Sequence, residues 1–174
     1  MRVVAVIVAL VLASAADARG QDHRLRLGVA ATVLTEAWDR NETHEWFAGL
    51  TAGLDRQVWK FVALRGEVMA LRVEQPDHGW LRGFTMGARG RWRRPHFRPV
   101  IDLAVGLSDS TVAVPKRGTT FNYLIVGGAG VELPVRAMTV DLGLRWLHVS
   151  NNGREGSGRN PDIQSLGITA GVSW

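Results

Sequence analysis

The chain has 174 residues, 20 glycines, no cysteine and a formal net charge of +5 at pH 7. This length suits a single domain, and the lack of cysteine excludes a disulfide framework. The basic surplus alone identifies no partner, although for an exported chain it favours anionic lipid phosphates over nucleic acid.

The first 20 residues have the composition of a secretory signal. Met1-Arg2 supplies a positive start, Val3 to Leu12 an apolar stretch, and Ala16-Asp17-Ala18 a small-residue cleavage site. The apolar stretch is too short for a transmembrane helix. We therefore expect a signal peptide over residues 1–20, and a single mature domain over 21–174.

Eight segments then alternate apolar with polar or small residues, which is the period of a β-strand with two different faces. In chain order they are Leu25–Val33, Trp46–Leu54, 59–73, Trp80–Trp92, Ile101–Leu107, Tyr123–Val131, Met138–Ser150 and Ser165–Trp174. Four apolar side chains fall on the polar faces and break the alternation: Phe61, Leu71, Leu124 and Val126.

Two architectures use such strands. A soluble sandwich or lipocalin-like barrel buries the apolar face, whereas an outer-membrane barrel turns it to lipid and fills its lumen with small and polar residues. The polar faces here carry acids and arginines in near balance, with hardly any lysine, which suits a paired interior network. The side chains concerned are Asp55, Glu67, Asp102, Glu132, Asp141, Arg65, Arg89, Arg91 and Arg145.

Tryptophans near both strand ends indicate the two aromatic belts of a membrane-spanning barrel. Trp46, Trp80 and Trp146 fall near one end, and Trp92 and Trp174 near the other. The sequence therefore predicts an all-β fold, an eight-stranded antiparallel up-and-down transmembrane barrel with an apolar exterior and a polar lumen.

Connections of alternating length agree with an up-and-down order. The predicted long loops are 37–44, 74–79, 109–119 and 151–162, and the predicted tight turns are 56–58, 94–98 and 134–135. With a periplasmic N-terminus, the long loops are extracellular and the short turns periplasmic. An eight-stranded lumen is filled by side chains, which disfavours a passive channel.

His148 and Ser150 continue the apolar face of the seventh segment, so we expect them outside the barrel at its outer end. An imidazole can activate a serine hydroxyl when a third group holds its tautomer. The eighth segment places Gln164 on the same face at the same depth, although it is an amide. Asn151 and the backbone amides through Gly153 are candidate oxyanion donors.

A simpler interpretation stays open for each candidate. His148 and Ser150 can be polar residues of the interfacial rim. Arg82, Arg154 and Arg159 can contact lipid phosphates or simply be solvated. The remaining histidines, His23, His44, His78 and His96, show no metal-ligand spacing, and we expect no metal site.

The run His148–Gly153, followed by Asn160–Ser165 at the start of the last strand, resembles the lipid A deacylase family (PagL-type acyloxyacyl hydrolases). The resemblance is most specific over 146–174. It implies an eight-stranded outer-membrane barrel that hydrolyses the ester-linked acyl chain at the 3-position of lipid A. It also implies that Ser150 is the nucleophile, His148 the general base, and Asn151 with Gly153 the oxyanion region.

The main departure from this family lies at Gln164, which occupies the position of the acidic triad member. Asp162, which shares the outward face, and Glu155 in the loop are the substitute carboxylates. An amide can orient His148 but cannot stabilise the imidazolium, so we expect reduced rather than abolished activity.

Together these observations predict a serine esterase of the bacterial outer membrane that removes an acyl chain from lipid A without a cofactor. The expected partners are lipopolysaccharide, with Arg154 and Arg159 as candidate contacts, and outer-membrane lipid; a homodimer is left open. The alternative is a non-catalytic structural or adhesive barrel that keeps a remnant of the motif.

Overall fold

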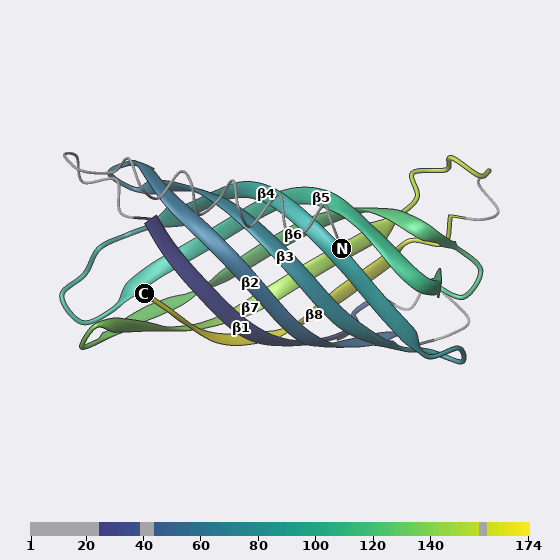
Figure 1. Cartoon of the computed structure of the whole chain (residues 1–174), viewed down its shortest axis with the longest axis horizontal. Helices are drawn as coiled ribbons and strands as arrows, with labels where there is room; N and C mark the ends of the chain where they lie inside the picture. Colours follow the sequence, from purple (N-terminus) through teal and green to yellow (C-terminus); the bar gives the residue numbers. More distant parts are fainter. Residues whose placement is uncertain (1–24, 39–43, 157–159) are drawn as a thin grey trace.

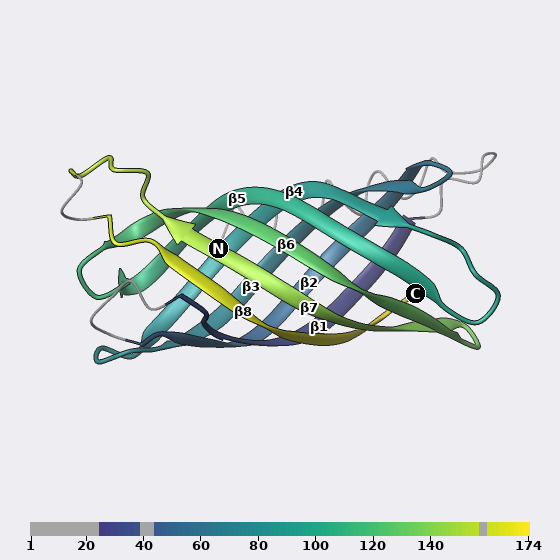
Figure 2. The same ribbon diagram turned by 180° about the vertical axis from the view of Figure 1, so that it is seen from behind.

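The structure is a computed structural model that describes residues 25–38, 44–156 and 160–174. It contains eight strands: β1 (Leu25–Glu36), β2 (Trp46–Trp59), β3 (Val62–Glu74), β4 (Gly79–Arg91), β5 (Arg98–Val114), β6 (Thr119–Val135), β7 (Met138–Ser150) and β8 (Ile163–Ser173). Each strand pairs antiparallel with the next, and β8 pairs with β1. The sheet therefore closes into the predicted eight-stranded barrel (Figures 1 and 2). The described residues form no helix long and apolar enough to cross a membrane.

The connections between strands divide between the two ends of the barrel. The turns 60–61, 92–97 and 136–137 lie at the end that also holds the C-terminus, whereas residues 151–156, which follow β7, extend from the other end (Figure 1). We call these the turn end and the loop end. The predicted signal peptide lies outside the described residues.

Several strands are longer than predicted. β2 runs to Trp59 and β6 to Val135, so the turns expected at 56–58 and 134–135 lie a few residues further along the chain. β5 continues to Val114, which leaves only 115–118 of the expected loop 109–119. The physical reason is that backbone pairing does not need apolar side chains, so strands extend past the segment in which lipid imposes alternation.

The exterior is apolar, as the alternation predicted. Large side chains on the outward faces are strongly exposed, including Leu50 at 66% and Ile168 at 64%. Such residues recur on all eight strands, and a continuous apolar band of this kind indicates contact with lipid. Exposed tryptophans lie at both ends, among them Trp46 at the loop end and Trp174 at the turn end, where they mark the two interfaces.

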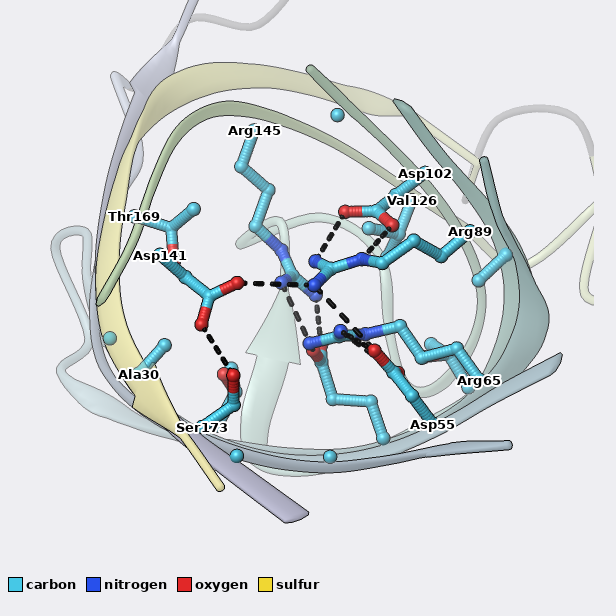
Figure 3. A pocket seen from close by; sticks show the side chains of 18 of the residues that line it. Ala30, Asp55, Arg65, Arg89, Asp102, Val126, Asp141, Arg145, Thr169 and Ser173 are labelled. Carbon is cyan, nitrogen blue, oxygen red and sulfur yellow. Dashed lines mark hydrogen bonds and ion pairs between the residues drawn. The ribbon is translucent and has the colours of Figure 1, made fainter. Parts of the chain in front are cut away.

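A charged network fills the half of the lumen nearer the turn end (Figure 3). Arg89 binds Asp102 through two hydrogen bonds, of 2.7 Å from Nε and 2.8 Å from Nη2. Arg91 donates to Glu132 at 2.8 Å and 2.9 Å, and its Nη2 to Asp55 at 2.9 Å. Arg26, Arg65, Glu67, Asp141 and Arg145 complete the network. The predicted interior pairing of acids and arginines is thus confirmed.

The half of the lumen nearer the loop end holds an apolar cluster beside buried polar side chains such as Glu36, Ser108 and Asn122. Leu34, Phe47, Leu81 and Leu147 are buried there, and the cluster also includes three of the side chains that broke the alternation: Leu71, Leu124 and Val126. The predicted polar lumen is therefore interrupted by an apolar cluster near the loop end. A cavity of about 60 Å³ remains beside the charged network.

Glu132 is the carboxylate on which the charged network depends most. Its side chain is fully buried, and Arg26, Arg89, Arg91 and Arg98 all lie within 4 Å of it. Replacement Glu132→Gln should lower the free energy of unfolding by about 3–5 kcal/mol, because it removes a buried counter-charge that four guanidinium groups share. Urea titration in lipid vesicles measures this change.

The matched control is Glu74→Gln, which removes a carboxylate whose partner, Arg72, is largely exposed. It should leave the free energy of unfolding nearly unchanged, because exposed ion pairs contribute little. Equal effects of the two replacements would contradict a structural role for the lumen network.

Candidate active site

β7 brings polar side chains to the outer surface at the loop end. Its odd residues point into the lumen, where Leu147 and Val149 are buried in the apolar cluster. Its even residues point outward, so half-buried His148 lies on the lipid side; Ser150, the last residue of the strand, shares this outward direction, but its side chain is only 9% exposed. In the register of the β7–β8 pair, His148 lies opposite Gln164.

Gln164 is the centre of a small hydrogen-bonded cluster on this surface. Its Nε2 lies 2.7 Å from His148 Nδ1 and donates to Asp162 Oδ2 at 2.9 Å. Its Oε1 accepts a hydrogen bond of 3.0 Å from Trp146 Nε1. Asp162 Oδ2 itself lies 3.8 Å from His148 Nδ1, and the ring of Trp146 stacks on that of His148 with centroids 6.1 Å apart.

The neighbours of Gln164 fix the direction in which its amide points. The indole of Trp146 can only donate, and an ionised Asp162 can only accept, so the amide oxygen faces Trp146 and the NH2 group faces Asp162. The NH2 group then also faces Nδ1 of His148, which must accept. In this arrangement the proton of neutral His148 resides on Nε2.

Ser150 is bound on the side away from this cluster. Its Oγ donates to Asn160 Oδ1 at 2.9 Å and accepts from the backbone amide of Asn152 at 3.1 Å. Asn160 Oδ1 also accepts from the backbone amide of Asn151 at 3.0 Å. The hydroxyl of Ser150 is therefore directed to Asn160 rather than to His148, which had been the expected partner.

The chain turns sharply after Ser150. Asn152 and Gly153 both have positive φ, 55° and 71°, and the amide of Gly153 donates to Asn151 Oδ1 at 2.9 Å. The backbone amides predicted as oxyanion donors are thus adjacent to Ser150, but in this structure they are engaged within the turn.

The other predicted site residues are spread more widely. Arg154 lies in the exposed turn, and its Nη1 is 3.5 Å from the hydroxyl oxygen of Tyr123. Tyr123 on β6 lies opposite Ser150 on β7 in the register of this strand pair. Glu155 is exposed in the same turn, and Arg159 lies outside the described residues. Arg82 lies on β4, separated from β7 by β5 and β6. No group of His, Cys, Asp or Glu suited to a metal ion occurs among the described residues.

Three residues of the site were not predicted as such. Trp146 had been assigned only to the aromatic belt, yet it orients both Gln164 and His148. Asn160 belonged to the motif that resembles the family, but no contact with Ser150 was predicted for it. Tyr123 could have been predicted as a neighbour of Ser150 from the pairing of β6 with β7.

A closed eight-stranded barrel with an apolar exterior and a polar site at its outer edge defines an outer-membrane barrel. Solved structures share this fold at low identity. The outer membrane enzyme PagL matches with a TM-score of 0.62, 16% identity, and coverage of 84% of this chain and 97% of that one. Neisserial surface protein A matches with a TM-score of 0.61, 14% identity, and coverage of 86% and 95%. The N-terminal β-barrel domain of Pseudomonas aeruginosa OprF matches with a TM-score of 0.51 and 12% identity, over 86% of this chain and 97% of that one.

The sequence model of the lipid A 3-O-deacylase (PagL) family matches residues 19–173. The chain therefore belongs to this family, and it is a protein of the bacterial outer membrane. No curated protein sequence matches it significantly. Family membership supports a hydrolase that acts on lipid A.

Asn160 anchors the start of the loop-end connection, because one side-chain oxygen holds both Ser150 Oγ and the Asn151 amide. Replacement Asn160→Ala should speed hydrogen exchange of the Asn151 amide about fivefold, which corresponds to a lost hydrogen bond of about 1 kcal/mol. Asn160→Asp retains the acceptor oxygen and should preserve the protection. Unchanged exchange in the alanine variant would show that the turn is held by other contacts.

Proposed function

We propose that this protein is a lipid A 3-O-deacylase, a serine esterase that hydrolyses an ester-linked acyl chain of lipopolysaccharide at the outer leaflet. The observation that carries this proposal is the placement of His148 and Ser150 on the lipid-facing surface at the loop end, with Gln164 and Asp162 beside the imidazole. Family membership supplies the substrate class.

The reaction that these groups would perform is a two-step acyl transfer. Ser150 Oγ attacks the ester carbonyl carbon while His148 Nε2 takes the hydroxyl proton. The bond from the carbonyl carbon to the sugar oxygen then breaks, and His148 returns the proton to that oxygen. Water attacks the acyl-serine, again through His148, which releases the fatty acid and restores Ser150.

Two side chains would have to move before this reaction can begin. The Ser150 hydroxyl must turn from Asn160 to His148, a rotation about one side-chain bond. The proton of neutral His148 must shift from Nε2 to Nδ1, because Nε2 needs a free lone pair to act as the base. An acceptor must then be available for the Nδ1 proton, and the NH2 group of Gln164 is not one.

We assign the acceptor role to Asp162 as a positioning residue. Its Oδ2 is already 3.8 Å from Nδ1 of His148 and is joined to the intervening amide of Gln164. A modest displacement of Gln164 would let the carboxylate accept the Nδ1 proton directly and stabilise the imidazolium. Glu155 is the weaker substitute, because the contacts to His148 come from the Gln164, Asp162 and Trp146 cluster.

The surroundings of Ser150 suit an amphiphilic substrate. Outward-facing Tyr123 and Ile125 lie across the β6–β7 pair from Ser150 and His148, and could contact an acyl chain that enters from the lipid. Arg154 in the turn after β7 would meet the anionic head of lipid A, and from its sequence position we expect the same of Arg159. The Asn160 amide, turned by half a rotation, would offer its NH2 group to a developing oxyanion.

The rival function is that of a non-catalytic barrel. Two observations favour it: the acidic position holds Gln164, and Ser150 binds Asn160 rather than His148. The two functions differ in whether lipid A changes when the protein is present.

Mass spectrometry of lipid A from cells that express the protein separates these functions. The proposal predicts loss of one hydroxyacyl chain with the natural sequence, and no loss with Ser150→Ala. Both proteins must be shown to be folded in the outer membrane by their heat-modifiable migration in gels. Lipid A that is unchanged by the folded natural protein would favour the non-catalytic barrel.

The role of Asp162 is tested with Gln164→Glu and Asp162→Asn, singly and together. A carboxylate at position 164 should raise kcat/KM about tenfold, because it accepts the Nδ1 proton with charge assistance. It should also move the acidic limb of the pH profile to higher pH, since it favours the charged imidazole. Asp162→Asn should lower kcat/KM about tenfold in the natural chain and much less in the Gln164→Glu background. An equal loss of kcat/KM in both backgrounds would show that Asp162 only stabilises the connection and does not accept the Nδ1 proton.

A further inference from the structure

Exposed cations gather in the turns and adjoining strand ends at the end of the barrel opposite to the candidate active site. They are Arg56, Lys60, Arg93, Arg94 and Arg136, which we call the cation rim. The described turn segments 56–61, 92–98 and 134–138 contain no Asp or Glu at all. Positive charge is therefore concentrated there, without the mixture of signs usual on a solvated surface.

The cation rim differs from the basic residues of the lumen, and from Arg72 and Lys116 at the loop end, in its lack of carboxylate partners among the described residues. In the lumen Arg89 and Arg91 each bind carboxylates directly. At the loop end, Arg72 pairs with Glu74 and Lys116 with Asp77. Within the described part of the chain, none of the five rim cations forms an ion pair with a carboxylate. Their counter-charge must come from outside the protein.

Backbone geometry adds an independent observation at Arg136. This residue has φ of 55°, the left-handed conformation that turns normally reserve for Gly or Asn. An arginine held there places a long cationic side chain at the tip of the β6–β7 turn, despite the less favourable backbone. In the β4–β5 turn, a hydrogen bond of 3.2 Å from the Arg94 amide to the Phe97 carbonyl fixes a second tip.

Aromatic side chains place the cation rim at the level of lipid headgroups. Trp59 is 77% exposed, and Trp92, Phe97 and Trp174 are exposed at the same end of the barrel. Amphipathic rings of this kind lie at the membrane–water interface. The ammonium of Lys60 lies 5.2 Å from the ring centre of Phe61 within this belt.

We propose that the cation rim binds the phosphates of anionic glycerophospholipids in the leaflet at the turn end, which is the periplasmic leaflet. Arginine suits such ligands because its guanidinium group can form two parallel hydrogen bonds to phosphate oxygens. The rim cations lie just beyond the apolar band, where anionic headgroups attract basic side chains. This inference is independent of the enzymatic proposal.

Quenching of tryptophan fluorescence by brominated lipids tests the proposal. The full protein is refolded in phosphatidylcholine vesicles that contain either brominated phosphatidylglycerol or brominated phosphatidylcholine. The ratio of quenching gives the relative affinity for the anionic lipid, and we expect a preference of about fivefold that weakens with added salt. Equal quenching by the two lipids would overturn the proposal and leave a soluble acidic partner as the explanation of the rim.

A triple variant locates the preference at the rim. The preference for anionic lipid should be abolished when Arg93→Gln, Arg94→Gln and Arg136→Asn are combined. Asn is chosen at position 136 because it adopts the left-handed backbone conformation readily. The matched control removes three charges at the loop end: Arg72→Gln, Lys116→Gln and Arg117→Gln. The control should retain the preference, and an equal loss in both variants would show a general effect of net charge.

A second measurement guards against failure of the triple variant to fold. The double variant Arg93→Gln/Arg94→Gln changes only exposed side chains of one turn, and should lose part of the preference. A double variant that quenches as the natural protein does would place the binding elsewhere and contradict the proposal.

Discussion

The register between β7 and β8 is the constraint on which the candidate site depends. Side chains alternate with a period of two, so a slip of one residue would send His148 and Ser150 into the lumen and Leu147 and Val149 out to the lipid. Closure of the barrel prevents such a slip, because β7 is also held by β6 and β8 by β1. The pairing of His148 with Gln164 is therefore determined by the hydrogen bonds of the whole sheet.

Two groups of lumen side chains, the charged network and the apolar cluster, stabilise this register. Near the turn end, arginines and carboxylates satisfy one another in a network that spans the barrel (Figure 3). Buried charges require such partners, and the network in turn links strands that do not pair. Near the loop end, Leu147 and Val149 pack with apolar residues from the other strands. At its loop end, β7 thus has a close-packed apolar inner face, and the polar side chains of the candidate site lie on the opposite side of the strand.

Alternation and balanced charge were enough to predict the barrel, the lipid-facing exterior, and the location of His148, Ser150 and Gln164. Strand ends were predicted less well, because backbone pairing continues beyond the apolar segments, as at Trp59 and Val135. The partners of the site residues were not predicted either. The bond from Ser150 to Asn160 depends on how the connection folds back, and the period of the strands carries no information about that path.

The amide at position 164 has a physical consequence that concerns the membrane as well as catalysis. Gln164 lies inside the strand pair beside Trp146, at the level of the aromatic belt, whereas Asp162 precedes β8 and is closer to the water. An ionised carboxylate on a lipid-facing surface costs less free energy near the interface than at greater depth. A neutral amide at 164 with an acid at 162 places the negative charge where it is better hydrated. This arrangement favours stable insertion into the membrane. In the proposed mechanism it does so at the expense of a direct contact between carboxylate and imidazole, which would best stabilise the imidazolium.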